Sequence, residues 1–172
     1  MTPSLILFLY FVGAFVVSVA VGMPIIKGLK KLRAGQNILE YVVQHEAKAG
    51  TPTMGGIMMI ISIIVITFGY CLYSRNVEEI MPVIVLALVS IGFGIVGFID
   101  DYKKVVLKNT EGLNPKLKMF GLLIISVLFT MYLINYVNLG TGIIIPFINY
   151  ELILPIWLYI PFIIVVMLGS TN

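Results

Sequence analysis

Long apolar runs constrain this chain more than any other feature. A helix of about 20 apolar residues crosses a hydrocarbon core of roughly 30 Å, and five such stretches occur, at residues 4–26, 54–74, 81–99, 119–137 and 152–169. Of all residues 60% are hydrophobic and 11% are charged, whereas a soluble domain carries about a quarter charged residues. The sequence therefore predicts an all-α integral membrane protein with five transmembrane helices in a single membrane domain, residues 1–172.

Two of the runs carry residues that shape helices. The fifth contains Pro155 and Pro161, so we expect it to bend or to start late. The third contains small residues that let neighbouring helices approach closely, namely Ser90, Gly92, Gly94 and Gly97.

The positive charges gather in two links between the runs. Of the eleven Lys and Arg residues, all but Arg75 lie in the loops 27–53 and 100–118. By the positive-inside rule both loops are cytoplasmic, which places the N-terminus outside. The link 138–151 is rich in Gly, then in β-branched residues, and has few charges. It predicts a short β-hairpin on the outer surface.

The first cytoplasmic loop ends in "HEAKAGTPTMGG", residues 45–56. Hydroxyl groups and two glycines let such a segment approach a phosphate or a sugar closely. Lys48 adds a cation that pairs with phosphate oxygens. An ordinary helix start, with Thr53 as N-cap and Lys48 as a topology charge, explains the same residues.

Asp100 and Asp101 follow the third apolar run directly. If that helix continues for a turn or two, Asp100, Lys104 and Lys108 share one face as an ion-pair ladder. Adjacent side chains on a helix point about 100° apart, so Asp101 is left to meet a cation or a substrate proton. Carboxylates surrounded by lysines also suit a phosphorylated substrate, with Mg²⁺ or a proton on the acids and phosphate on the lysines. Both interpretations, ladder and active site, remain open at this point.

Three motifs resemble those of the phospho-N-acetylmuramoyl-pentapeptide transferases: "GTPTMGG" (50–56), "DDYKKV" (100–105) and "EGLNPKLK" (111–118), together with the final "GSTN". The Asp-Asp pair alone is shared with the wider group of polyprenyl-phosphate sugar-1-phosphate transferases. The resemblance implies about half of a ten-helix bundle, truncated at its C-terminus. It also implies a bacterial plasma-membrane enzyme of peptidoglycan synthesis whose active site faces the cytoplasm.

The family's reaction moves phospho-N-acetylmuramoyl-pentapeptide from its UDP carrier to undecaprenyl phosphate, giving lipid I and UMP. By the resemblance Asp100 and Asp101 are the catalytic acidic pair, with Asp100 as the proton acceptor. The implied cofactor is Mg²⁺, with its main ligand beyond Asn172, so this chain alone is expected to be inactive. The implied substrate and phosphate site consists of Lys48, Thr53, Lys116 and Asn172.

The implied partners are undecaprenyl phosphate, UDP-N-acetylmuramoyl-pentapeptide and membrane lipid, and no nucleic acid. A homodimer is compatible with the resemblance. One alternative is a transferase that uses another UDP-amino sugar, and a second is a non-catalytic membrane protein. A third is a transporter, which would favour carboxylates deeper within the apolar runs than Asp100 and Asp101. The sequence leaves open whether the lipid phosphate attacks directly or through a covalent intermediate.

The distribution of lysines predicts the topology. Cysteines introduced at Gly35 and Thr110 should be shielded from membrane-impermeant thiol reagents added to intact cells, whereas a cysteine at Thr141 should be labelled. The opposite labelling pattern would reverse the orientation and move the acidic pair away from the cytoplasm.

Overall fold

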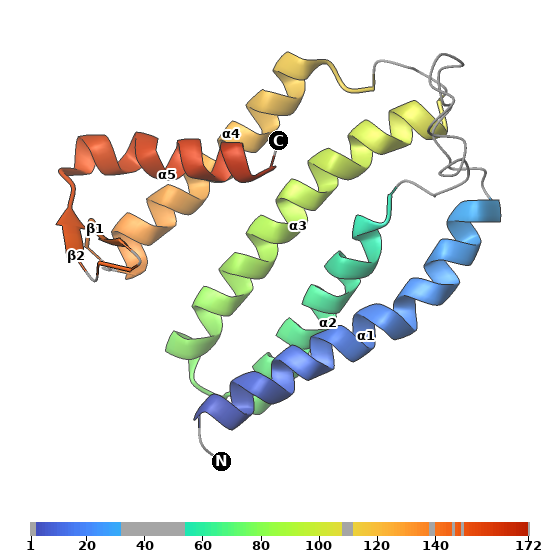
Figure 1. The fold of residues 1–172 in the computed structure, drawn as a ribbon, viewed down its shortest axis with the longest axis horizontal. Coiled ribbons are helices and arrows are strands. Elements are labelled where there is room, and N and C mark those ends of the chain that lie inside the picture. Colours follow the sequence, from blue (N-terminus) through green and yellow to red (C-terminus); the bar gives the residue numbers. More distant parts are fainter. Residues whose placement is uncertain are drawn as a thin grey trace. The chain divides into compact units, whose positions relative to one another are not determined.

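The computed structural model describes residues 3–31, 54–107, 112–137, 140–145, 147–148 and 150–171. Figure 1 shows the elements in chain order: α1 (Pro3–Lys31), α2 (Gly56–Tyr73), α3 (Val77–Val105), α4 (Pro115–Tyr132), the π-helix η2 (Leu133–Val137), β1 (Gly142–Ile145), β2 (Tyr150–Ile153) and α5 (Ile156–Thr171). The chain divides into two compact units, Met1–Asn114 and Pro115–Asn172.

The helices confirm the predicted class of a multi-pass, all-α membrane protein. Four segments within the described ranges are long and apolar enough to cross a membrane: Ser4–Lys31, Gly56–Tyr73, Val77–Val105 and Pro115–Val137. The fifth predicted run differs, because residues up to Ile153 form a strand and α5 begins only at Ile156. Pro155 lies directly before α5, and a proline cannot donate the backbone hydrogen bond of an earlier helical turn. The expected late start of this helix is confirmed.

Close contact between α2 and α3 depends on a small residue in the first unit. A Cβ atom added at Gly94 of α3 would lie 2.7 Å from the Cδ1 atom of Ile60 in α2. The predicted role of small residues in helix approach is confirmed at this position. Helix α1 packs on α2 as well, and the rings of Tyr10 and Tyr70 meet edge to face at 5.6 Å between centroids.

Helix α3 extends well past the apolar run on which it was predicted. Its start is capped by Asn76, whose side-chain oxygen accepts a hydrogen bond of 3.1 Å from the backbone N–H of Glu78. Its last turns run on beyond Ile99 to Val105. Asp100 and Asp101 are therefore helical residues, which is the condition that the predicted ion-pair ladder needed.

In the second unit, α4 packs against α5 and buries a stripe of small polar residues. The Ser126 hydroxyl donates to the Leu122 carbonyl at 2.9 Å, and the Thr130 hydroxyl donates to the Ser126 carbonyl at 2.7 Å. Because both hydroxyls are satisfied within their own helix, the face stays compact and buried without a polar penalty.

A two-stranded antiparallel sheet lies between η2 and α5. Gly142 pairs with Ile153, and Ile145 pairs with Tyr150 at the end nearest the turn. The hairpin predicted for the link 138–151 is confirmed, with its second strand reaching two residues further.

The helix contact at Gly94 gives a test of the packing in the first unit. Gly94→Ala should lower the free energy of unfolding by about 1–2 kcal/mol relative to Gly97→Ala, because only the former methyl group meets a neighbour. Gly97 is the matched control on the same helix, with open space around an added Cβ. Thermal unfolding in detergent measures the difference, and adding Ile60→Val should reduce it. Equal stabilities of the two alanine variants would contradict the close approach.

Candidate active site

The candidate site is built around Asp100, a buried carboxylate near the C-terminal end of α3. Its residue exposure is 7%. A buried carboxylate is costly unless charged or polar partners satisfy it. The local geometry therefore has to supply those partners.

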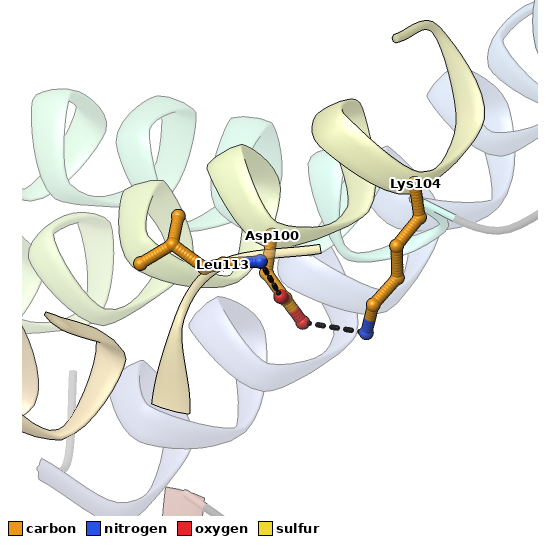
Figure 2. Close-up of polar contacts among 3 residues, drawn as sticks. All are labelled: Asp100, Lys104 and Leu113. Carbon is orange, nitrogen blue, oxygen red and sulfur yellow. Dashed lines mark hydrogen bonds and ion pairs between the residues drawn. The ribbon is translucent and has the colours of Figure 1, made fainter. Parts of the chain in front are cut away.

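Both oxygens of Asp100 accept hydrogen bonds (Figure 2). The Lys104 ammonium donates to Oδ2 at 2.9 Å, and the backbone N–H of Leu113 donates to Oδ1 at 2.8 Å. The first contact is the i, i+4 pair that the sequence predicts, so that rung of the ladder is confirmed. Lys108, the next rung, lies outside the described residues. The second contact reaches 13 residues along the chain and ties the segment after the loop onto α3.

Gly112 makes the contact with Leu113 sterically feasible. Its φ angle is +71°, in the left-handed region that favours glycine. A Cβ atom at this position would lie 2.6 Å from Asp100 Oδ1 and would collide with the Lys104 side chain. A side chain there would push the segment away from the carboxylate that Leu113 binds.

Asp101 occupies a different environment from its neighbour. It is half-buried, and in the part of the chain that the structure describes no hydrogen bond or ion pair engages its carboxylate. Its side chain points about 100° away from that of Asp100 around the helix. One aspartate is thus fixed by its contacts, and the other offers its oxygens to a ligand.

Sequence reasoning missed Gly112, Leu113 and Met54 as structural residues of this region. Met54 has a φ of 69°, is buried, and clusters with Leu29 between the ends of α1, α2 and α3. The partly buried Val105 and Ile57 pack against that pair. A signal for Met54 was present, because it is an apolar residue inside a polar, Gly-rich segment.

The remaining predicted site residues lie outside the described residues or in the other compact unit. Lys48, Thr53 and Asn172 lie outside the described residues. Lys116 lies in the first turn of α4, in the second compact unit, and is exposed. Across the described ranges no group of three or more His, Cys, Asp or Glu side chains is arranged to hold a metal ion.

Fold and site together define a multi-pass membrane protein that carries a fixed carboxylate, a neighbouring accessible carboxylate and a lysine at one helix end. Comparison with known proteins finds enzymes of one name that are similar to this chain. The chain is 40% identical over 175 residues to the phospho-N-acetylmuramoyl-pentapeptide-transferase of Bacillus subtilis, covering all of this chain and 52% of that protein. It is 39% identical over 172 residues to the enzyme of the same name from Halalkalibacterium halodurans, covering 97% of this chain and 50% of that one.

A third relative with that name, from Staphylococcus saprophyticus, is 42% identical over 151 residues, or 86% of this chain. No protein-family model matches the chain. The similarity confirms the resemblance drawn from the motifs. The chain spans about half the length of the curated relatives it matches.

The role of Gly112 can be tested against a second glycine of the same backbone conformation. Gly140 has a φ of +70° but open space where a Cβ would lie. Both Gly112→Ala and Gly140→Ala should lose about 1 kcal/mol to backbone strain. Only Gly112→Ala should also free the Leu113 amide, so that its hydrogen exchange speeds up by about tenfold or more.

Hydrogen exchange followed by mass spectrometry, with fragments covering residues 112–118, measures this difference. Asp100→Asn should accelerate the same amide, because it removes the charge from the acceptor. Unchanged protection of Leu113 in Gly112→Ala would contradict the fixed geometry of Figure 2.

Proposed function

We propose that this chain supplies the acidic half of a phospho-N-acetylmuramoyl-pentapeptide transferase site at the cytoplasmic face of the bacterial plasma membrane. The observation that carries the proposal is the match to enzymes of that name along nearly the whole chain, combined with a doubled carboxylate held at a helix end. The substrates would be undecaprenyl phosphate and UDP-N-acetylmuramoyl-pentapeptide, and the products lipid I and UMP.

In this reaction an oxygen of the lipid phosphate bonds to the phosphorus that carries the sugar. The bond from that phosphorus to the oxygen of UMP breaks, and UMP leaves with the bonding electrons. The attacking oxygen is a better nucleophile once its proton has gone to a base, and a positioned carboxylate can accept that proton. Both reactants are anionic, so cations must neutralise the phosphate oxygens as they approach.

Asp100 has the geometry of a positioned base. Two hydrogen bonds fix the orientation of its carboxylate, and a carboxylate held in one orientation can accept a substrate proton at a set position. A fixed orientation favours the reaction because it lowers the entropic cost of reaching the reactive geometry.

Lys104 links substrate binding to the basicity of Asp100. Its side chain is 44% exposed, so the ammonium can turn towards an incoming phosphate. Once that cation turns to the phosphate, the carboxylate of Asp100 loses a stabilising opposite charge and becomes a better proton acceptor. Phosphate binding would thereby prepare Asp100 to take the proton.

Among the described residues of the candidate site, Asp101 suits Mg²⁺. The ion binds through one or two carboxylates together with substrate phosphates and waters, and a half-buried carboxylate with no partner in the described part of the chain can serve as one such ligand. When bound, Mg²⁺ would neutralise phosphate charge. Further ligands would come from outside the described residues, and we propose that Lys48, Thr53, Lys116 and Asn172 contact the substrates.

The test combines this chain with the part of a relative that it does not match. Membranes would contain this chain together with the part of the Bacillus subtilis transferase that it does not match, and would receive undecaprenyl phosphate, Mg²⁺ and labelled UDP-N-acetylmuramoyl-pentapeptide. We expect lipid-linked label and UMP. The two parts of the Bacillus subtilis enzyme, expressed separately in the same way, form the positive control. Activity in that control without any in the mixed sample would refute the proposal, and transfer only from another UDP-amino sugar would change the substrate.

In the active mixture Asp100→Asn should lower turnover by roughly 10²–10⁴-fold, the usual contribution of a general base. Binding of the UDP substrate should change much less, because the variant keeps the size of the side chain and the proposed role of Asp100 is towards the lipid phosphate. Lys104→Gln and Lys108→Gln are a matched pair on one predicted face. Only Lys104→Gln should slow the reaction, since Lys104 pairs with Asp100. Near-normal turnover in Asp100→Asn would show that Asp100 is not the base and that its pairing with Lys104 is structural.

A further inference from the structure

The turn between β1 and β2 exposes apolar side chains that the proposed activity does not use. Phe147 is 104% exposed and Ile148 is 73% exposed, and we call these two residues the hairpin tip. Ile144 and Ile153 on the strands are exposed as well. From residue 133 to residue 156 the sequence has one charged side chain, Glu151. An exposed apolar cluster of this kind marks an interaction surface.

Short connections keep the hairpin at the membrane boundary. Strand β1 begins five residues after η2 ends, and α5 begins three residues after β2 ends. A residue spans at most about 3.6 Å, so the base of the hairpin lies within roughly 11 Å of the first residue of α5. Four-residue strands add about 13 Å. The tip therefore lies within about 24 Å of the first residue of α5, which is near enough for the hairpin to fold back onto the membrane surface.

Aromatic side chains mark that plane on both helices. Tyr132 and Tyr136 stack at 5.8 Å between ring centroids near the end of η2, and Trp157 is exposed at the start of α5. Tyr and Trp favour the headgroup level of a bilayer, where one part of the ring is apolar and the other is wet. We expect the apolar surface of the hairpin tip to continue the lipid-facing surface of the helices beside it. Figure 1 shows the hairpin between the end of α4 and the start of α5.

Backbone chemistry limits how deep the hairpin can lie. A two-stranded sheet has two outer edges with unpaired N–H and C=O groups, and such edges are excluded from the hydrocarbon core. An isolated hairpin of this size is also only marginally stable in water. Glu151 pairs with Ile144 across the sheet. Its carboxylate occupies the space where a side chain at Gly142 would lie, at the end of the sheet away from the tip. The charge can stay in water while the tip is buried.

We propose that the hairpin is an interfacial membrane anchor: it lies against the bilayer surface with Phe147 and Ile148 inserted among the lipid headgroups. The partner is the lipid of the leaflet in which η2 ends and α5 begins. Insertion fixes the depth of the α4–α5 pair and holds the connection between these helices flat on the membrane. The inference rests on the exposure and connectivity of the hairpin and is independent of the transferase activity.

The chain has a single tryptophan, Trp157, which makes a fluorescence test direct. In a Trp157→Phe background, Phe147→Trp places one reporter at the hairpin tip, and an aromatic residue replaces an aromatic residue at the positive φ of 77°. The protein would be reconstituted in phosphatidylcholine vesicles brominated at either the 6,7 or the 11,12 acyl positions. Ile148→Trp in the same background is the second reporter, in case the first variant misfolds.

We expect the shallow bromines to lower the fluorescence of the tip about twofold, and more than the deep bromines do, as for a residue buried about 5–10 Å into the interface. Acrylamide in water should quench it only weakly. Adding Ile148→Asp to the Phe147→Trp reporter should move the tip into water. Acrylamide should then quench the fluorescence strongly, and the bromines should quench it weakly. Strong acrylamide quenching without quenching by lipid would place the tip in water and overturn the proposal. Protection from both quenchers would mean that a second copy or another protein covers the tip, which would overturn it as well.

Discussion

The carboxylate of Asp100 is the interaction on which the candidate site depends. It is buried on α3 and receives one bond from its own helix, through Lys104, and one from the returning chain, through the backbone N–H of Leu113. Removing an ionised group from water costs several kcal/mol, so either bond alone would leave part of that cost uncompensated. The two together hold the segment at residues 112–113 in place, and that segment is where the chain begins its path to the next membrane helix.

The same end of the helices is stiffened by apolar packing. Met54 and Leu29, with Val105 beside them, join the ends of α1, α2 and α3 within the first unit. Met54 adopts a backbone conformation that is uncommon for a residue with a side chain, and burial against Leu29 offsets that strain. The proposed site for two anionic substrates would need fixed groups, because freely moving charges would reorganise during the reaction and stabilise the transition state less. Here a polar anchor and an apolar cluster both limit movement at the end of α3.

The two aspartates differ although they are adjacent. Helical geometry turns Asp100 towards Lys104 and the segment at Leu113, and leaves Asp101 half-buried and able to meet a ligand. In the proposed reaction, fixation would suit the base that meets a proton at a set distance, and an open carboxylate would suit a cation that also binds phosphate. This division follows from the rotation of about 100° per residue, and a loop carrying the same pair would not impose it.

The sequence by itself determined the membrane class, the hairpin, the late start of α5 and the Asp100–Lys104 pair, because apolar length, β-branched composition, proline position and i, i+4 spacing are local properties. Only the tertiary structure revealed the bond from Leu113, since a backbone N–H carries no side-chain signature and its partner lies 13 residues away. The same holds for the requirement for glycine at 112 and for the contact of Gly94 with Ile60. These contacts join segments that are separate in the sequence. They depend on how the helices pack, so no single stretch of residues predicts them.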